Sequence, residues 1–162
     1  MINKIKRALI SVTDKSKIKQ ILKILKKYNV KIVSSGGTFK EIKRLGYNCE
    51  EISKYTNSDE ILNGRVKTLH PKLYAGILSK RNNKKHKKEL KINKYEEIDL
   101  VIVNFYPFEK TLEVTKNHQK LIENIDIGGP TLVRATAKNY KDTTILTSPD
   151  QYDEFVINFE NN

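Results

Sequence analysis

The feature that most constrains the fold of this chain is the alternation of short apolar runs with amphipathic stretches. Four runs are apolar and partly β-branched, at residues 8–12, 30–34, 99–103 and 143–147. Such runs are typical of parallel strands that are buried on both faces. After the first run, Ile18, Ile21, Leu22 and Leu25 follow the spacing of one helical face. The alternation predicts one α/β domain over residues 1–162, with a mostly parallel β-sheet and helices on both faces.

Local signals indicate where the helices begin and end. Thr13 and Asp14 are suitable N-cap residues before the first helix. Thr38 and Glu41 have capping-box spacing, so a second helix is expected to open there and to stop at Gly46. Pro130 suits the first turn of a later helix that runs to about Asn139. The lysine-rich stretch 80–94 is expected to be an exposed helix or loop.

The composition excludes several classes of protein. No apolar run approaches the roughly 18 residues that a membrane-spanning helix needs, and no signal-peptide pattern follows the basic N-terminus. Cys49 is the single cysteine and the three histidines are scattered, so neither a disulfide scaffold nor a zinc site is expected. The sequence therefore predicts a cytoplasmic domain that contacts no membrane and holds no metal.

The net charge of +12 raises the alternative of a nucleic-acid-binding protein. Only five of the 31 basic residues are arginine, and the lysines are spread over most of the chain. Base readout prefers arginine and aromatic side chains gathered on one face. A solvated lysine surface is the favoured interpretation, and no nucleic-acid partner is expected.

Ligands of open parallel sheets bind at the carboxyl ends of the strands, where this sequence has small and hydroxyl-bearing residues. The turn Ser35-Gly36-Gly37-Thr38 follows the second run and opens a helix. Two glycines allow close approach of an anion to the backbone, and a helix N-terminus favours negative charge. Lys15, from the turn after the first run, would add a point charge. The turn is a candidate phosphate site, with a plain tight turn before a capped helix as the alternative.

Two further segments carry candidate chemistry. In Gly64–Pro71, Arg65 and Lys67 are suited to clamping a phosphate, whereas a basic surface loop and a structural role for His70 are the alternatives. In Asp126-Ile127-Gly128-Gly129-Pro130, a carboxylate precedes a second glycine turn onto a helix that ends near Lys138. A helix start can stabilise an oxyanion, and Asp126 and Lys138 are candidates for proton exchange. The alternative is that Asp126 caps the helix and Lys138 favours its C-terminus.

Taken together and in order, six blocks of this sequence resemble the N-terminal cyclohydrolase domain of the family that pairs AICAR transformylase with IMP cyclohydrolase. The blocks are 11–15 (SVTDK), 34–38 (SSGGT), 64–71 (GRVKTLHP), 104–108 (NFYPF), 125–131 (IDIGGPT) and 137–140 (AKNY). The resemblance implies a fold like that of methylglyoxal synthase. It also implies ring closure of formyl-AICAR ribonucleotide to inosine monophosphate with loss of water, a reaction without metal or cofactor.

The resemblance also implies roles for individual residues. The catalytic residues would be Lys138 as the main proton donor and acceptor, with Lys67, Asp126 and Tyr106 to position or polarise the reacting groups. The residues that bind the purine nucleotide would be Thr13, Asp14, Lys15, Ser35, Gly36, Gly37, Thr38, Arg65, Val66, Thr68, Asn104, Ile127 and Gly128. From the residues alone, these positions are expected to gather at the strand ends.

Members of this family continue into a C-terminal formyltransferase domain, which is expected to be absent from this chain because it stops at Asn162. The resemblance implies a homodimer. The main alternative is a catalytically silent domain of the same fold that binds a phosphorylated metabolite. Methylglyoxal synthase is a third possibility, which the 64–71 block and Tyr106 do not suit.

Overall fold

The computed structural model describes residues 5–105 and 108–161. Five parallel strands form one sheet in the order β3-β2-β1-β4-β5. The strands are β1 (Arg7–Ser11), β2 (Lys31–Ser34), β3 (Glu50–Glu51), β4 (Leu100–Val103) and β5 (Thr144–Leu146). The prediction of an α/β fold with a parallel sheet is confirmed. Each long strand lies within about a residue of its apolar run.

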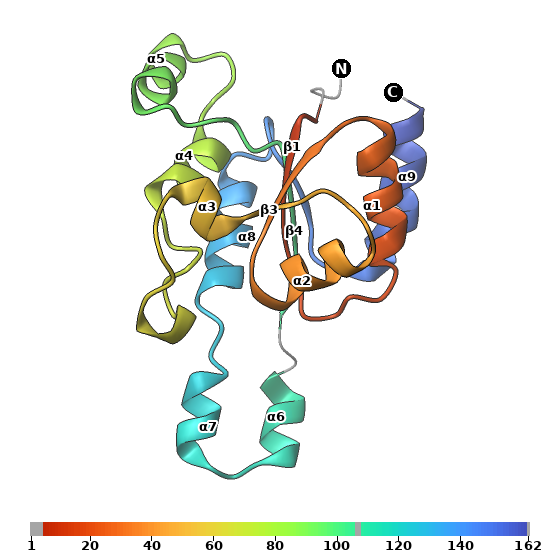
Figure 1. The fold of residues 1–162 in the computed structure, drawn as a ribbon, viewed down its shortest axis with the longest axis vertical. Coiled ribbons are helices and arrows are strands. Elements are labelled where there is room, and N and C mark those ends of the chain that lie inside the picture. The colour runs from red at the N-terminus through yellow and green to blue at the C-terminus, as the bar shows by residue number, and fades with distance from the viewer. Residues whose placement is uncertain (1–4, 106–107, 162) are drawn as a thin grey trace.

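Helices cover both faces of this sheet (Figure 1). The helices are α1 (Ile18–Lys27), α2 (Gly36–Arg44), α3 (Ile52–Thr56), α4 (Pro71–Leu78), α5 (Lys84–Asn93), α6 (Phe108–Val114), α7 (His118–Glu123), α8 (Gly128–Lys138) and α9 (Tyr152–Glu160), with short 3₁₀ turns at Leu62–Gly64 and Pro149–Gln151. Helices α1, α2 and α9 pack on one face of the sheet, and α3, α4 and α8 pack on the other. The α6–α7 pair extends beyond the sheet and contributes no buried residue to the core.

The strand side chains divide between two hydrophobic clusters. In β4, Leu100 and Ile102 join the cluster under α1, whereas Val101 and Val103 join the cluster under α4 and α8. Successive side chains of a strand point to opposite faces, so a continuous apolar run is needed where both faces are covered. This explains why the apolar runs were a reliable signal for the strands.

Two predicted helix starts are wrong: the turn before α1 is held by Asn104, which follows β4, and the expected cap of α2 is bonded to Val12. Helix α1 begins only at Ile18, and the backbone N–H groups of Thr13 and Asp14 donate to Asn104 Oδ1 at 2.7 and 2.9 Å. Helix α2 begins at Gly36, two residues before Thr38. The Thr38 hydroxyl is instead bonded to both backbone groups of Val12, accepting from its N–H at 3.0 Å and donating to its carbonyl at 2.9 Å.

Candidate functional site

A cavity of about 790 Å³ opens at the carboxyl ends of β1 and β4. Strand order reverses between these two strands, because the chain adds β2 and β3 on one side of β1 and β4 and β5 on the other. Such a switch point is where open parallel sheets bind ligands. The walls come from the turns after β1, β2 and β4, the 62–69 loop and the segment 122–129.

The glycine turn after β2 lies in this cavity and is flanked by two cations. A Cβ at Gly36 would lie 2.8 Å from Lys67 Nζ, and one at Gly37 would lie 3.9 Å from Lys15 Nζ. Gly36 has a φ of +53°, which an L side chain rarely adopts. The two ammonium groups therefore flank the start of the nine-residue helix α2, whose N-terminus favours anions.

Ser35, at the N-cap position of α2, has a hydroxyl without a partner among the described residues. Its side chain makes no capping hydrogen bond, and the residue is 6% exposed. A buried hydroxyl without a partner is costly. Because Ser35 lines the cavity, an anion bound at the glycine turn would offer this hydroxyl an acceptor.

Arg65, in the 62–69 loop, pairs with Glu123 at the end of α7. Its guanidinium donates to the two carboxylate oxygens at 2.5 and 3.3 Å. Both side chains are more than half exposed, so the pair adds little to stability. It nevertheless links the 62–69 loop to the 122–129 segment, and both segments line the cavity.

The start of α8 forms another wall, where two glycines allow close packing. A Cβ at Gly128 would collide with the Thr68 hydroxyl, and one at Gly129 would collide with Asp126 and Phe105. Asp126 Oδ1 accepts a hydrogen bond from the Gly129 N–H at 2.9 Å. The carboxylate thus caps the first turn of α8 while its residue lines the cavity.

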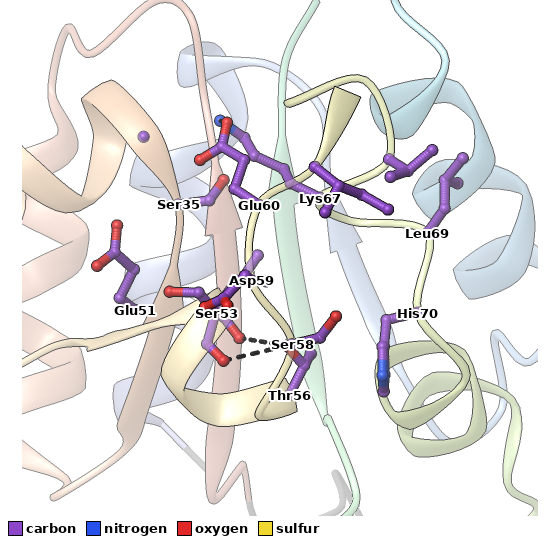
Figure 2. Close-up of a pocket in the computed structure, with 14 residues that line it drawn as sticks. Ser35, Glu51, Ser53, Thr56, Ser58, Asp59, Glu60, Lys67, Leu69 and His70 are labelled. Atoms are coloured by element: carbon purple, nitrogen blue, oxygen red, sulfur yellow. Dashed lines mark hydrogen bonds and ion pairs between the residues drawn. The ribbon is translucent and has the colours of Figure 1, made fainter. Parts of the chain in front are cut away.

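A smaller cavity of about 140 Å³ adjoins the first and shares Ser35, Val66, Lys67 and Leu69 with it (Figure 2). Its other polar side chains are the hydroxyls and carboxylates of Glu51, Ser53, Thr56, Ser58, Asp59 and Glu60, and the imidazole of His70. Lys67 is therefore positioned between a wall that carries the glycine turn and a wall that carries carboxylates.

Most of the predicted site residues are brought together. The large cavity is lined by Thr13, Lys15, Ser35, Gly37, Thr38, Arg65, Val66, Lys67, Thr68, Asn104, Asp126, Ile127 and Gly128. Gly36 lines the smaller cavity. Tyr106 lies outside the described residues. Asp14 lines neither cavity; its exposed carboxylate accepts from the Ser16 N–H at 2.8 Å, and this hydrogen bond holds its pKa below the ordinary value.

Lys138 does not join this group, and the expectation that it lies at the strand ends is wrong. It is the last residue of α8, is exposed and lines neither cavity. A helix of 11 residues places its last Cα about 15 Å from its first. Because α8 starts at the carboxyl edge and runs back along the sheet, its last turn reaches the opposite edge. There the next residue, Asn139, donates to the carbonyls of Ile77 and Ser79.

Two of the lining residues are already engaged in holding the site together. The Asn104 amide accepts from the N–H groups of Thr13 and Asp14 and donates to the Asp14 carbonyl at 2.9 Å. The Thr38 hydroxyl is bonded to Val12, as described above. Both side chains therefore fix the turns that form the cavity.

His70 has the structural role that was the alternative at the sequence level. Its Nδ1 accepts from the Lys72 N–H at 3.1 Å, so it is the N-cap of α4. Sequence reasoning missed Glu60 and Glu123, the carboxylates that pair with Lys67 and Arg65. Glu60 stands just before the 64–71 block, and this proximity was the only signal available for it.

Within residues 5–105 and 108–161, no cluster of three or more His, Cys, Asp or Glu side chains is arranged to hold a metal ion. In the same ranges, no helix is both long enough and apolar enough to cross a membrane.

Fold and site together define an open parallel α/β domain whose switch point carries a glycine turn between two lysines, as in phosphate-binding domains of this architecture. A family model described as the MGS-like domain matches residues 17–131. The chain belongs to the MGS-like domain family.

Several curated proteins and a solved structure are similar to this chain. It is 49% identical over 150 residues to the bifunctional purine biosynthesis protein PurH of Prochlorococcus marinus subsp. pastoris, an alignment covering 92% of this chain and 29% of that protein. It is 48% identical over 151 residues to PurH of Clostridioides difficile, covering 93% of this chain and 30% of that protein. The chain thus spans less than a third of the length of these relatives. A crystal structure of ForH superposes with a TM-score of 0.84 at 28% identity, covering 97% of this chain and 80% of that one.

Proposed function

We propose that this chain acts in purine biosynthesis as an IMP cyclohydrolase domain, which closes the ring of formyl-AICAR ribonucleotide to give inosine monophosphate and water. The observation that carries the proposal is the single cavity that joins a cation-flanked glycine turn to the capped start of α8. The similarity to PurH proteins over nearly the whole chain supports it. In the proposal, residues 1–162 form one cyclohydrolase domain.

The glycine turn would hold the 5′-phosphate of the substrate. Lys15 and Lys67 supply two positive charges, and the free N–H groups of α2 and the Ser35 hydroxyl supply donors. Charge-assisted hydrogen bonds of this kind are short and strong. The purine end of the nucleotide would then extend along the cavity towards Asp126 and Gly128.

Ring closure forms one C–N bond and breaks one C–O bond. The carboxamide nitrogen attacks the formyl carbon, and the proton that it loses moves to the formyl oxygen. The resulting hydroxyl leaves as water, while the formamido nitrogen loses its proton and a C=N bond forms. The enzyme must therefore hold the two groups together, accept protons and stabilise negative charge on the oxygen.

The residues of the cavity are suited to these tasks. The N–H groups at the start of α8 can donate to a developing oxyanion at the purine end, and the Asp126 carboxylate can accept a proton there. The Lys67 ammonium would hold the phosphate at the other end of the cavity. The resemblance assigns further roles to Tyr106, which lies outside the described residues, and to Lys138. The role of Lys138 stays a prediction, and it requires this lysine to reach the nucleotide from the far end of α8, about 15 Å along the helix from Gly128.

The experiment is turnover of formyl-AICAR ribonucleotide by the purified chain, followed by ultraviolet absorbance as inosine monophosphate forms. We expect Lys67→Ala to lower the rate at least about a hundredfold, because it removes a cation from the cavity. Lys141→Ala, an exposed lysine at the opposite edge, is the matched control. Lys138→Ala in the same assay tests the role implied by the resemblance.

A wild-type chain that binds inosine monophosphate without turnover would contradict the proposal and favour the silent metabolite-binding domain. The homodimer implied by the resemblance stays a prediction, which sedimentation of the purified chain tests.

A further inference from the structure

Lys67 is paired with a carboxylate from outside the block in which it lies. Glu60 Oε1 is 3.6 Å from Lys67 Nζ, and both side chains line the smaller cavity. Figure 2 shows the Lys67 side chain extending towards the Glu60 carboxylate. Within the ranges that the structure describes, Glu60 is the acidic residue within ion-pair distance of this lysine.

Two glycines make room for this pair. A Cβ at Gly36 would approach Lys67 Nζ, and a Cβ at Gly64 would collide with Glu60 Oε1. Both glycines have a positive φ, +53° and +85°, which other residues rarely adopt. The glycine turn and the 62–69 loop therefore both leave space for the Lys67 ammonium and the Glu60 carboxylate.

The pair matters because a lysine ammonium stands on a flexible four-carbon stem. Lys67 is 31% exposed at its side chain, so solvent would otherwise compete for its ammonium group. A carboxylate at 3.6 Å limits the positions that the ammonium can take. Those positions lie beside Gly36, at the N-terminus of α2.

We propose that Glu60 is a positioning residue, which holds the Lys67 ammonium against the glycine turn so that it meets the phosphate of the nucleotide. This inference rests on the proposed function for the identity of the nucleotide. The contact between Glu60 and Lys67 itself does not depend on it.

The test is a double-mutant cycle read by calorimetric binding of inosine monophosphate and by turnover. Glu60→Gln should weaken binding about three- to fivefold, the range of an exposed ion pair. In a Lys67→Ala background, the same change should have less than about a twofold effect, because Glu60 then has no ammonium to hold. Glu60→Asp, which keeps the carboxylate on a shorter stem, should recover part of the loss. Glu113→Gln, an exposed carboxylate on α6, should bind like the wild type.

The contact between Glu60 and Lys67 can also be tested without any nucleotide, by measuring the acetylation rate of each lysine with peptide mass spectrometry. Glu60→Gln should raise the acetylation rate of Lys67 several-fold and leave that of Lys15 unchanged.

Equal losses of inosine monophosphate binding from Glu60→Gln in the wild-type and Lys67→Ala backgrounds would overturn the proposal, since Glu60 would then act on the loop and not through Lys67. Tighter binding by Glu60→Gln would also overturn it, because the carboxylate would then only compete with the phosphate. If turnover is absent from the wild type, the proposed function fails while binding and acetylation still decide the role of Glu60.

Discussion

Cys49 packs against the hydrophobic cluster that lies under α1 and α2. Burial of the thiol raises its pKa to about 12, because the low-dielectric surroundings disfavour the thiolate. The thiolate is the form that reacts with alkylating reagents. At pH 8 the folded protein should therefore react with iodoacetamide at least about a hundredfold more slowly than the denatured chain. Mass spectrometry of timed samples, with and without urea, measures both rates, and equal rates would contradict the expectation.

The same shift has a consequence for stability. Above pH 9 the cysteine of the unfolded chain ionises, whereas the half-buried thiol of the folded chain keeps its proton up to about pH 12. The unfolded state then binds fewer protons than the folded state, so the free energy of unfolding falls as the pH rises through this interval.

At the level of single residues, the sequence predicted a side chain's hydrogen bond correctly where its partner is near in the chain. His70 caps α4 through Lys72, and Asp126 caps α8 through Gly129, as one of the interpretations of each motif expected. The carboxylate Glu123 was missed because its partner Arg65 is 58 residues away. No short pattern reveals such a pair.

Among the elements, the turn between β1 and α1 depends on one side chain of the neighbouring strand. Asn104, which follows β4, makes three hydrogen bonds to the backbone of Thr13 and Asp14. Asn104→Ala should lower the free energy of unfolding by about 2 kcal/mol, because partly buried backbone groups lose their partners. It should also weaken binding of inosine monophosphate, since Thr13 and Lys15 line the cavity from this turn.

Urea unfolding and calorimetry measure the two effects of this change. Asn104→Asp keeps the oxygen that accepts from both N–H groups, so it should retain more stability than the alanine variant. A fully stable alanine variant would show that water replaces the amide without cost.

The same turn explains why the ends of the helices were harder to predict than the helices. The apolar stripe of α1 was visible in the sequence because it depends on residues of one helix. The first residues of α1 and α2 depend also on hydrogen bonds to other segments, as at Asn104 and Thr38. Helix α4 was not predicted, because Gly76 lies between its apolar residues Leu73 and Ile77 and glycine disfavours a helix. The structure shows why a glycine is there: it packs closely against the backbone of Glu96.

For the molecule as a whole, a buried ionic network closes the amino edge of the sheet. Asp99 accepts from the N–H groups of Lys6 and Arg7 at 2.8 and 3.1 Å and from the Arg81 guanidinium at 3.3 Å. The side chains of Asp99 and Arg81 are only 9% and 13% exposed. Removing one member of a buried pair leaves the other charge without a partner. Asp99→Ala should therefore lower the free energy of unfolding by about 3 kcal/mol.

Urea unfolding at neutral pH tests this expectation. Glu97→Ala, which removes a more exposed carboxylate 3.5 Å from the same arginine, is the matched control and should cost less than about 1 kcal/mol. Similar losses of unfolding free energy from Asp99→Ala and Glu97→Ala would contradict the expectation, because the burial of Asp99 would then add nothing to the stability.

At this scale the fold was predicted from the sequence, whereas the position of Lys138 was not. The apolar runs specify strands that are covered on both faces, which leaves few architectures other than a parallel α/β sheet. The position of Lys138 could have been predicted from helix length, because an 11-residue helix that starts at one edge ends near the other.

The central position of β1 has a consequence for synthesis of the chain. Ala8, Leu9 and Ile10 are fully buried, yet Asp99, which bonds to the start of the same strand, lies 92 residues after Arg7. At the usual rate of translation, roughly 5–18 s pass between the two. During this interval one edge of β1 has no neighbouring strand, and such an edge can pair with other chains. The speed of the ribosome, rather than the stability of the finished domain, therefore sets how long its most buried strand is exposed to aggregation.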